Sequence, residues 1–371
     1  MTAKNLTYIV SDMSKMIALE WIIDYRDKSL TNLSFIFLNK GDSEIEAFVQ
    51  QHKLPFIRIP YHGKKDLPKA IWQSFRFLRA QRTEIVHCHL FDACMVGLTA
   101  ARMAGVPKRI FTRHYATYHH VYFPKAVKYD RFMNAMATDI VAISELVKRV
   151  LIKDEQVPES KVSLVHHGFL LSEYDNVTKE RIAHFKSKYG LGAEPVIGVV
   201  ARYTLLKGIQ FIIPAFKQLL QHYPDAKLLI ANSHGNDEAY LKGLMQDIPA
   251  QNIVEVKYER DMGALYKSLS AYVHVPIYDH IEAFGQTYVE ALMARIPSVF
   301  TLSGVASEFI VHERNALVVP FEDAGAIFEA LMRLLSDKDL CKQLENQGYE
   351  DTRKLFSLER MISGLEKLYI S

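Results

Sequence analysis

Residues 279–293 read Asp-His-Ile-Glu-Ala-Phe-Gly-Gln-Thr-Tyr-Val-Glu-Ala-Leu-Met, and we expect this stretch to begin as a loop and end as a helix. Gly285 marks the transition, because a residue without a Cβ lets the backbone turn tightly and lets a ligand come close. Val289, Leu292 and Met293 then recur at the spacing of a helix that is buried on one side.

The start of this predicted helix is a candidate anion site with a carboxylate on either side. Its first amides, on Gly285, Gln286 and Thr287, have no partner inside the helix and attract negative charge. Glu282 precedes these amides and Glu290 follows them. A nucleotide-sugar has phosphate in the middle and hydroxyls at both ends, so the arrangement suits such a ligand. Taken alone, two glutamates eight residues apart are also typical of a solvent-exposed helix face.

Short apolar segments alternate with helical segments along the whole chain. This pattern predicts an α/β protein with doubly wound parallel sheets, covered by helices on both faces and binding ligands at the carboxyl ends of the strands. The predicted strands are residues 6–10, 34–38, 56–59, 85–89, 109–112, 139–143 and 162–165, then 196–200, 226–231, 252–256, 271–275, 298–301 and 316–319.

The chain of 371 residues is long for a single domain. The polar segment 188–194 contains two glycines and precedes Pro195, so it is a candidate linker. We therefore expect a first Rossmann-like domain over residues 1–190 and a second over 191–354. A last helix in residues 355–371 is expected to pack back on the first domain.

Charge is distributed unevenly between the two halves. Residues 1–190 carry 28 Lys and Arg against 19 Asp and Glu, whereas residues 191–371 carry 17 against 23. The basic half indicates an anionic partner, either an anionic lipid surface or a phosphate-bearing acceptor, although solvated surface lysines would give the same count. The chain has no apolar run long enough to span a bilayer, and its three cysteines show no paired spacing. We expect a cytoplasmic protein.

The opening stretch resembles a known family signature. Glu282-Ala-Phe-Gly, followed by Glu290-Ala-Leu-Met, resembles the E-x7-E motif of the retaining glycosyltransferases of family 4, which have the two-domain GT-B fold with a cleft between the domains. The resemblance implies that Glu282 contacts the donor sugar as a catalytic residue and that Glu290 accepts hydrogen bonds from ribose hydroxyls. Phe284, within the same motif, is placed on the donor side with the three helix amides.

A second resemblance lies after the predicted strand 196–200. Arg202 and Lys207 stand five residues apart in a strand-to-helix loop, and the guanidinium fork and the mobile ammonium both suit phosphate oxygens. The loop resembles the family's G-R-x4-K-G element, whose two cations bind the diphosphate. These cations would take the place of a metal ion, so we expect metal-independent chemistry and no cofactor.

The first half carries weaker candidates. Thr112-Arg113-His114 resembles the family's T-x-H element, which implies that His114 hydrogen-bonds a sugar hydroxyl and acts as a catalytic residue. Tyr115 opens a dense aromatic run that would either stack on sugar or lipid or pack its own loop. His89 and Lys15 are expected at the acceptor side. His87 and His89 share one strand face with Cys88 between them, but no further ligand stands at metal spacing, so we expect no metal site.

Together these features predict a retaining, metal-independent hexosyltransferase. The donor is expected to be a UDP-sugar, with GDP as the next choice, and the acceptor a glycan or lipid-linked molecule in surface polysaccharide or lipopolysaccharide synthesis. An anionic membrane surface is a further expected partner, which would make the protein peripheral on the inner face of the membrane, and nucleic acid is not expected. The alternatives are a GT-B sugar-nucleotide epimerase or phosphorylase, or a nucleotide-binding protein without catalysis. The sequence does not identify the sugar, the linkage or the oligomeric state.

Overall fold

The computed structural model describes residues 2–371, which divide into two compact units. The first unit comprises the chain up to Gly168 together with Leu358–Ser371, and the second comprises Phe169–Ser357. The division at 190 and 191 expected from the linker composition therefore falls inside the second unit. No helix within residues 2–371 is both long and apolar enough to cross a bilayer.

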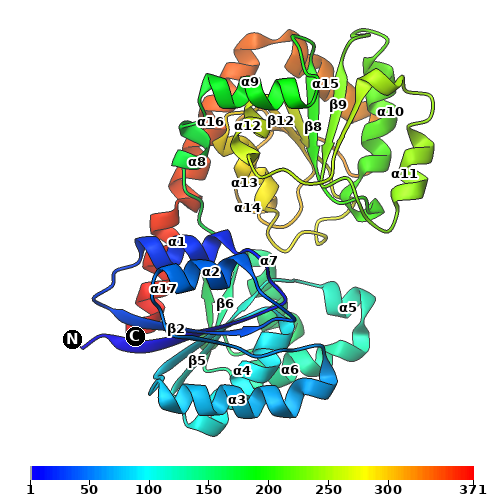
Figure 1. The fold of residues 1–371 in the computed structure, drawn as a ribbon. Helices are drawn as coiled ribbons and strands as arrows, with labels where there is room; N and C mark the ends of the chain where they lie inside the picture. The colour runs from blue at the N-terminus through cyan, green and yellow to red at the C-terminus, as the bar shows by residue number, and fades with distance from the viewer. Residues whose placement is uncertain (1) are drawn as a thin grey trace. The chain divides into compact units, whose positions relative to one another are not determined.

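The first unit is a parallel sheet of seven strands in the order β3-β2-β1-β4-β5-β6-β7. Its strands are β1 (Lys4–Ser11), β2 (Thr31–Leu38), β3 (Phe56–Arg58), β4 (Ile85–His89), β5 (Lys108–Arg113), β6 (Asp139–Ala142) and β7 (Val162–Leu164). Helices cover both faces, with α1 and α2 on one side and α3, α4 and α6 on the other (Figure 1).

The helices of this unit are α1 (Ile17–Tyr25), α2 (Glu44–Gln51), α3 (Leu67–Ala80), α4 (Phe91–Ala104), α5 (Tyr118–Tyr122), α6 (Val127–Met136), α7 (Glu145–Arg149) and α17 (Leu358–Ile370). Four short helical segments complete it: η1 (Lys64–Asp66), η2 (Pro124–Ala126), η3 (Val150–Asp154) and η4 (Glu159–Lys161).

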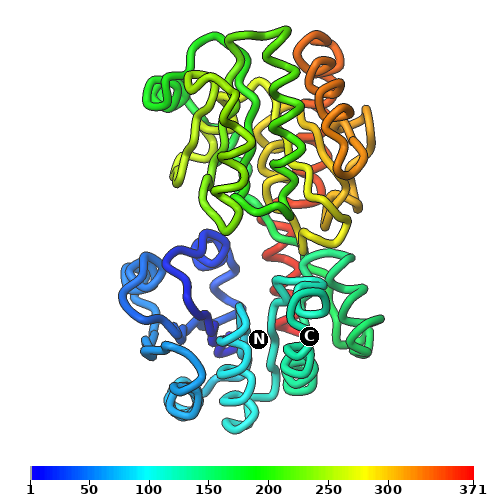
Figure 2. Tube along the Cα trace, turned by 90° about the vertical axis from the view of Figure 1, so that its right-hand side faces the viewer, coloured from blue at the N-terminus to red at the C-terminus, as the bar shows by residue number. Residues whose placement is uncertain are grey.

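The last helix, α17, packs in the first unit, as the red end of the tube in Figure 2 shows. The Tyr369 hydroxyl lies 2.6 Å from the Tyr8 hydroxyl of β1 and 2.7 Å from Nδ1 of His87 on β4. The other His87 nitrogen, Nε2, lies 2.8 Å from the Thr112 hydroxyl. Because these groups are buried, each hydrogen bond replaces a lost contact with water and fixes the end of the chain to the centre of the sheet.

The second unit is a parallel sheet of six strands in the order β10-β9-β8-β11-β12-β13. Its strands are β8 (Val196–Val200), β9 (Lys227–Ala231), β10 (Ile253–Val256), β11 (Ala271–His274), β12 (Ser298–Phe300) and β13 (Leu317–Val318). The predicted alternation of strands and helices in two doubly wound sheets is confirmed.

The helices of the second unit are α8 (Ser172–Asp175), α9 (Lys179–Lys188), α10 (Ile209–Leu219), α11 (Glu238–Leu244), α12 (Met262–Lys267), α13 (Gln286–Met293), α14 (Ala306–Phe309), α15 (Ala324–Ser336) and α16 (Lys338–Phe356), with the short segments η5 (Leu205–Lys207) and η6 (Ala250–Asn252). A core of Val, Ile, Leu and Phe side chains fills the space between β8, β9, β11 and α10. This core fixes the ends of β8 and β11, where the polar loops begin.

Candidate functional site

The strand order of the second unit reverses between β8 and β11, which are neighbours in the sheet although three helices and two strands separate them in sequence. In open parallel sheets, ligands bind at the carboxyl edge beside such a reversal, because the two following loops diverge there. The loop after β8 carries Arg202 and Lys207, and the loop after β11 carries Glu282.

These two loops pack directly on each other. The Ile277 amide donates to the Leu206 carbonyl at 3.2 Å. Gly208 has φ +74°, and a Cβ added to it would lie 1.9 Å from the Val275 carbonyl oxygen. A side chain at this position would therefore push the loop that carries Lys207 away from the end of β11.

Lys207, Glu282 and His274 form one hydrogen-bonded cluster. The Lys207 ammonium and Nε2 of His274 lie 2.5 Å and 3.0 Å from the same oxygen, Oε1, of Glu282. Burial alone would raise the pKa of Glu282, but the hydrogen bond from His274 and the charge of Lys207 more than offset it and lower that pKa to about 2. Burial lowers the pKa of His274, so a neutral imidazole donates from Nε2. Glu282 is thus an ionised acceptor whose Oε2 makes no hydrogen bond within residues 2–371.

A second loop braces the backbone around Glu282. The Ser303 hydroxyl accepts from the Glu282 amide at 3.0 Å. The amides of Gly304 and Val305 donate to the carbonyls of Asp279 and Phe284 at 3.1 and 2.9 Å. The loop from 279 to 285 is therefore held at three points before α13 begins.

Helix α13 begins as predicted. Gly285 caps it with φ +88°. The amides of Gly285, Gln286 and Thr287 donate to no acceptor within the described chain, so they are available to an anion. Arg202 is exposed, and its guanidinium makes no hydrogen bond or ion pair with residues 2–371.

Glu290 lies one turn further along α13. The Tyr266 hydroxyl of α12 donates to its Oε2 at 2.9 Å. Burial raises the pKa of Glu290, and the Tyr266 hydrogen bond lowers it in part. Glu290 thus contacts a polar group of a neighbouring helix and does not point into an apolar core.

Phe284 has a different environment from the other donor-side candidates. Its ring is buried and lies 6.3 Å from the Phe169 ring and 5.7 Å, edge-on, from the Phe356 ring. The side chain therefore packs the loop against the rest of its unit.

The first unit groups several of its candidates at the carboxyl ends of β4 and β5. Nδ1 of His89 lies 3.1 Å from Nε2 of His114, and the His114 ring stacks on His167 at 5.6 Å. Burial lowers the pKa of all three imidazoles, to about 4 for His167, so they are neutral near pH 7. Nε2 of His89 is buried with no hydrogen-bond partner. No group of three His, Cys, Asp or Glu side chains within residues 2–371 has the arrangement of a metal site.

Tyr115 and Lys15 are separate from this histidine group. The Tyr115 hydroxyl donates to the buried carboxylate of Asp130, and its ring lies 3.8 Å from the Arg113 guanidinium. Tyr115 therefore belongs to a buried ionic network. Lys15 is exposed in the loop after β1.

The sequence did not predict that His274 and Ser303 hydrogen-bond Glu282, or that Tyr266 hydrogen-bonds Glu290. His274 offered a signal, because a histidine at the end of an otherwise apolar strand is typical of a site at the carboxyl edge. Ser303 and Tyr266 offered none, since each reaches its partner through the fold.

Two protein-family models match this chain. The model of Glycosyltransferase Family 4 matches residues 34–173, and that of Glycosyl transferases group 1 matches residues 182–351. The capsular polysaccharide biosynthesis glycosyltransferase CapM of Staphylococcus aureus is 26% identical, with 81% of this chain and 80% of CapM covered. The UDP-Gal:alpha-D-GlcNAc-diphosphoundecaprenol alpha-1,3-galactosyltransferase of Escherichia coli is 21% identical, with 82% and 80% covered.

The fold is also that of solved glycosyltransferases. The structure of Anabaena Alr3699/HepE in complex with UDP-glucose gives a TM-score of 0.82 at 16% identity, covering 98% of this chain and 100% of that one. At this identity the likeness concerns the fold, which is GT-B. With both family models matched in succession along it, the chain belongs to the glycosyl transferases group 1, glycosyltransferase family 4.

Proposed function

We propose that this glycosyltransferase is a retaining enzyme that moves a hexose-type sugar from a nucleotide-sugar to a glycan or lipid-linked acceptor. UDP is the favoured nucleotide and GDP the next. The observation that carries the proposal is the cluster of Lys207, His274 and Glu282 beside the free amides of α13, because it combines an anion site with an ionised hydroxyl acceptor.

The diphosphate would bind Arg202, Lys207 and the amides of residues 285–287. Negative charge grows on the leaving nucleotide as the glycosidic bond breaks, and fixed cations and amide dipoles stabilise it there without reorganisation. These groups supply the role that a divalent cation has in other phosphate-binding enzymes. We therefore propose metal-independent transfer.

The two glutamates would hold the sugars at either end of the diphosphate. Glu282 keeps Oε2 free while Lys207 and His274 hold Oε1, so it can accept from a hydroxyl of the donor sugar. Glu290 would accept from ribose hydroxyls. We further propose that His114 hydrogen-bonds a sugar hydroxyl as a neutral imidazole, a state that its lowered pKa favours.

Two observations support a proposal for the acceptor class: the names of two relatives and the positive charge of the first half of the chain. CapM is named for capsular polysaccharide biosynthesis, and the E. coli enzyme is named for a diphosphoundecaprenol-linked acceptor. An acceptor of that kind sits in a membrane, and the basic first half of this chain suits an anionic lipid surface. We propose a role in surface polysaccharide synthesis, peripheral to the membrane.

A thermal-shift series with UDP, GDP and ADP tests the donor site, since a ligand that binds the folded state raises its melting temperature. UDP is expected to give the largest rise at equal concentration, with and without EDTA. No rise with any of the three nucleotides would contradict the proposal. Incubation of the UDP-sugars without acceptor then distinguishes transfer from epimerisation, because an epimerase needs no second substrate.

A further inference from the structure

His89 and His114 of the first unit are joined by a single hydrogen bond. Nδ1 of His89, at the end of β4, lies 3.1 Å from Nε2 of His114, which follows β5 directly. Burial lowers the pKa of both rings, so each imidazole is neutral and carries one proton on its two nitrogens. One of the two facing nitrogens is therefore the donor and the other the acceptor, and this choice fixes the tautomer of both residues.

The surroundings of His89 indicate which ring donates. The residue is only 5% exposed, and its Nε2 is buried with no hydrogen-bond partner. If His114 donated, the proton of His89 would lie on Nε2, as a buried N–H group without an acceptor. If His89 donates, only a lone pair is buried there. Among backbone groups an orphaned buried N–H is the rarer of these two defects, and we expect the same of a side chain.

His114 gives the same answer from the other side of the hydrogen bond. It is partly exposed, and its Nδ1 makes no hydrogen bond with residues 2–371 but reaches solvent. When His89 donates, the proton of His114 lies on this Nδ1, where water or a bound molecule can accept from it. The reverse arrangement would bury the unpaired donor and leave a lone pair at the surface. Donation from His89 to His114 therefore leaves no unpaired donor of this pair buried.

The ring of His89 is held in place by packing and by its backbone. It lies 4.4 Å from the His87 ring and 5.7 Å from the Tyr8 ring. The next residue, Leu90, has φ 73° and ψ 158°, a conformation that glycine adopts easily and other residues rarely adopt. Strained residues of this kind persist where the surrounding structure fixes them, and they are frequent beside functional groups. The packing and this turn together fix the direction in which His89 donates.

We propose that His89 is a positioning residue that keeps the proton of His114 on Nδ1, so that His114 donates a hydrogen bond to an oxygen of the bound sugar. In this tautomer the solvent-facing nitrogen of His114 has no lone pair, so His114 binds and orients the sugar and does not act as a base. His89 is buried and acts on the sugar through His114. The proposal rests on the proposed function only for the bound sugar, because the tautomer is measured without one.

Long-range proton–nitrogen correlation spectra of protein with isotope-labelled histidines test the tautomer directly. A protonated imidazole nitrogen and a bare one resonate far apart, and the His114 signals are those that disappear in His114→Gln. We expect a protonated Nδ1 and a bare Nε2 for His114 in the parent, which is the less favoured form of a free histidine side chain. In His89→Leu the signals should shift toward the opposite tautomer. A proton on Nε2 of His114 in the parent would overturn the proposal.

Two substitutions of His89 separate its hydrogen bond from its ring. Asn places a side-chain N–H group close to the position of Nδ1, whereas Leu removes the donor at similar volume. We expect His89→Asn to keep the tautomer of His114 and a kcat close to that of the parent. His89→Leu should lower kcat by about 10- to 100-fold through misplacement of His114. The KM for the donor should change little, since the proposed donor groups belong to the second unit.

His52→Leu is the matched control. It removes an imidazole of the same unit that lies 2.9 Å from Asp24, away from the end of β4, and it should leave kcat and the His114 signals unchanged. Circular dichroism of each variant shows that the fold is retained. Parent-like kcat in His89→Leu would overturn the proposal. So would an equal loss of kcat in His89→Asn and His89→Leu, because the ring and not the hydrogen bond would then be required.

Failure of this proposal differs from failure of the proposed function. If the parent transfers no sugar, the spectra of His114 still decide the tautomer. A UDP-induced rise in melting temperature of equal size in the parent and in His89→Leu shows that the donor site is intact when kcat falls. Loss of that rise in His89→Leu would contradict a role confined to His114.

Discussion

The ammonium group of Lys207 and one carboxylate oxygen of Glu282 lie 2.5 Å apart, and both side chains are largely shielded from water. The positive charge of Lys207 and the negative charge of Glu282 compensate each other in this pair. A diphosphate would compete with Glu282 for the Lys207 ammonium, while His274 continues to hold the carboxylate. When a donor binds, the Lys207 ammonium would therefore contact the diphosphate in place of Glu282, and the cluster would not need to reassemble.

Lys207→Ala is expected to weaken UDP binding by about 10-fold or more and to lower the free energy of unfolding by about 1–3 kcal/mol, because Glu282 loses its cation. Adding Glu282→Gln should restore stability without restoring transfer. The control Lys217→Ala breaks a surface pair with Asp247 and should change stability by less than about 0.5 kcal/mol. Urea titration and UDP calorimetry measure both effects, and unchanged UDP affinity in Lys207→Ala would contradict the role.

Glu290→Gln keeps an oxygen for the Tyr266 hydroxyl but loses the negative charge that ribose hydroxyls would favour. We expect the melting temperature without ligand to stay near that of the parent, while the UDP-induced rise is clearly reduced. Glu329→Gln, on the exposed side of α15, is the control. If the variant responded to UDP like the parent, Glu290 would have no part in nucleotide binding.

Gly208→Ala should destabilise the second unit by about 1–3 kcal/mol, because alanine would have to adopt a positive φ. The added methyl group also meets the Val275 carbonyl, so the Lys207 loop should move and UDP affinity should fall. Gly243→Ala is the matched control, since nothing lies within 4 Å of its position in α11. That change should stabilise the helix by about 0.5–1 kcal/mol. Equal melting temperatures for the two variants would show that the second unit tolerates a side chain at position 208.

Stability is expected to depend on pH through the buried histidines of the first unit. Burial lowers the pKa of His87 to about 3 and that of His167 to about 4. Between pH 6.5 and about 4 the unfolded chain binds protons on these rings and the folded chain does not, so the free energy of unfolding falls as pH falls.

Urea denaturation at pH 7, 6 and 5 measures this slope. Replacing His87 by Gln should reduce it by about 1.4 kcal/mol per pH unit below pH 6, the effect of one proton. Replacing the exposed His62, which pairs with Asp66 at the surface, is the control because it removes a histidine that lies outside the buried group. A parent protein with no pH dependence in this range would refute the buried neutral state.

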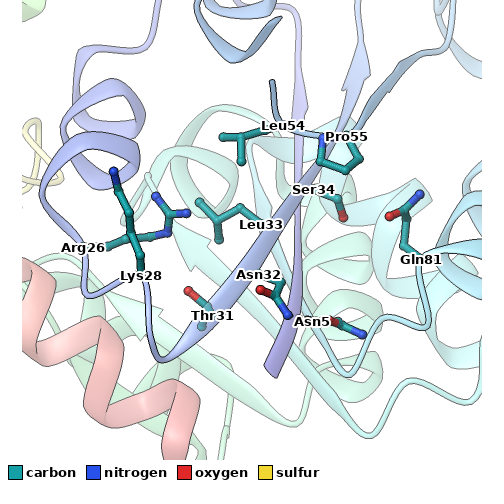
Figure 3. Close-up of a pocket in the computed structure, with 10 residues that line it drawn as sticks. All are labelled: Asn5, Arg26, Lys28, Thr31, Asn32, Leu33, Ser34, Leu54, Pro55 and Gln81. Atoms are coloured by element: carbon teal, nitrogen blue, oxygen red, sulfur yellow. Dashed lines mark hydrogen bonds between the residues drawn. The ribbon is translucent and has the colours of Figure 1, made fainter. Parts of the chain in front are cut away.

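One pocket of the first unit lies away from the candidate site residues. A pocket of about 360 Å³ is lined by Asn5, Arg26, Lys28, Thr31 and neighbouring residues, at the amino ends of β1 and β2 (Figure 3). Ligands of parallel sheets bind at the opposite edge, so the pocket is not a candidate donor or acceptor site.

Local patterns were sufficient to predict the sheets and the family. The helix after Gly285 and the strand 196–200 could be predicted from the sequence, because the spacing of apolar residues and the position of a glycine determine backbone conformation over a few residues. The hydrogen-bond partners of Glu282 and Glu290 could not be predicted from the sequence. Tyr266 and Glu290 are 24 residues apart, and His274 meets Glu282 only because β11 ends beside that loop. In sequence, the aromatic run after Tyr115 is compatible with packing or with binding, and the structure divides it. Its histidines contact buried carboxylates, whereas Tyr118, Tyr122 and Phe123 are exposed.

The position of α17 has a consequence for how the protein is made. The Tyr369 hydroxyl completes a hydrogen-bonded chain with Tyr8 and His87, although Tyr369 follows Tyr8 by 361 residues in the sequence. The amino-terminal sheet emerges first from the ribosome but lacks α17 until the whole second unit has been synthesised. The middle of the polypeptide, which builds the other sheet, is therefore synthesised before the first unit has all its elements, and a nonsense mutation within the codons for α17 would damage the part that was translated earliest.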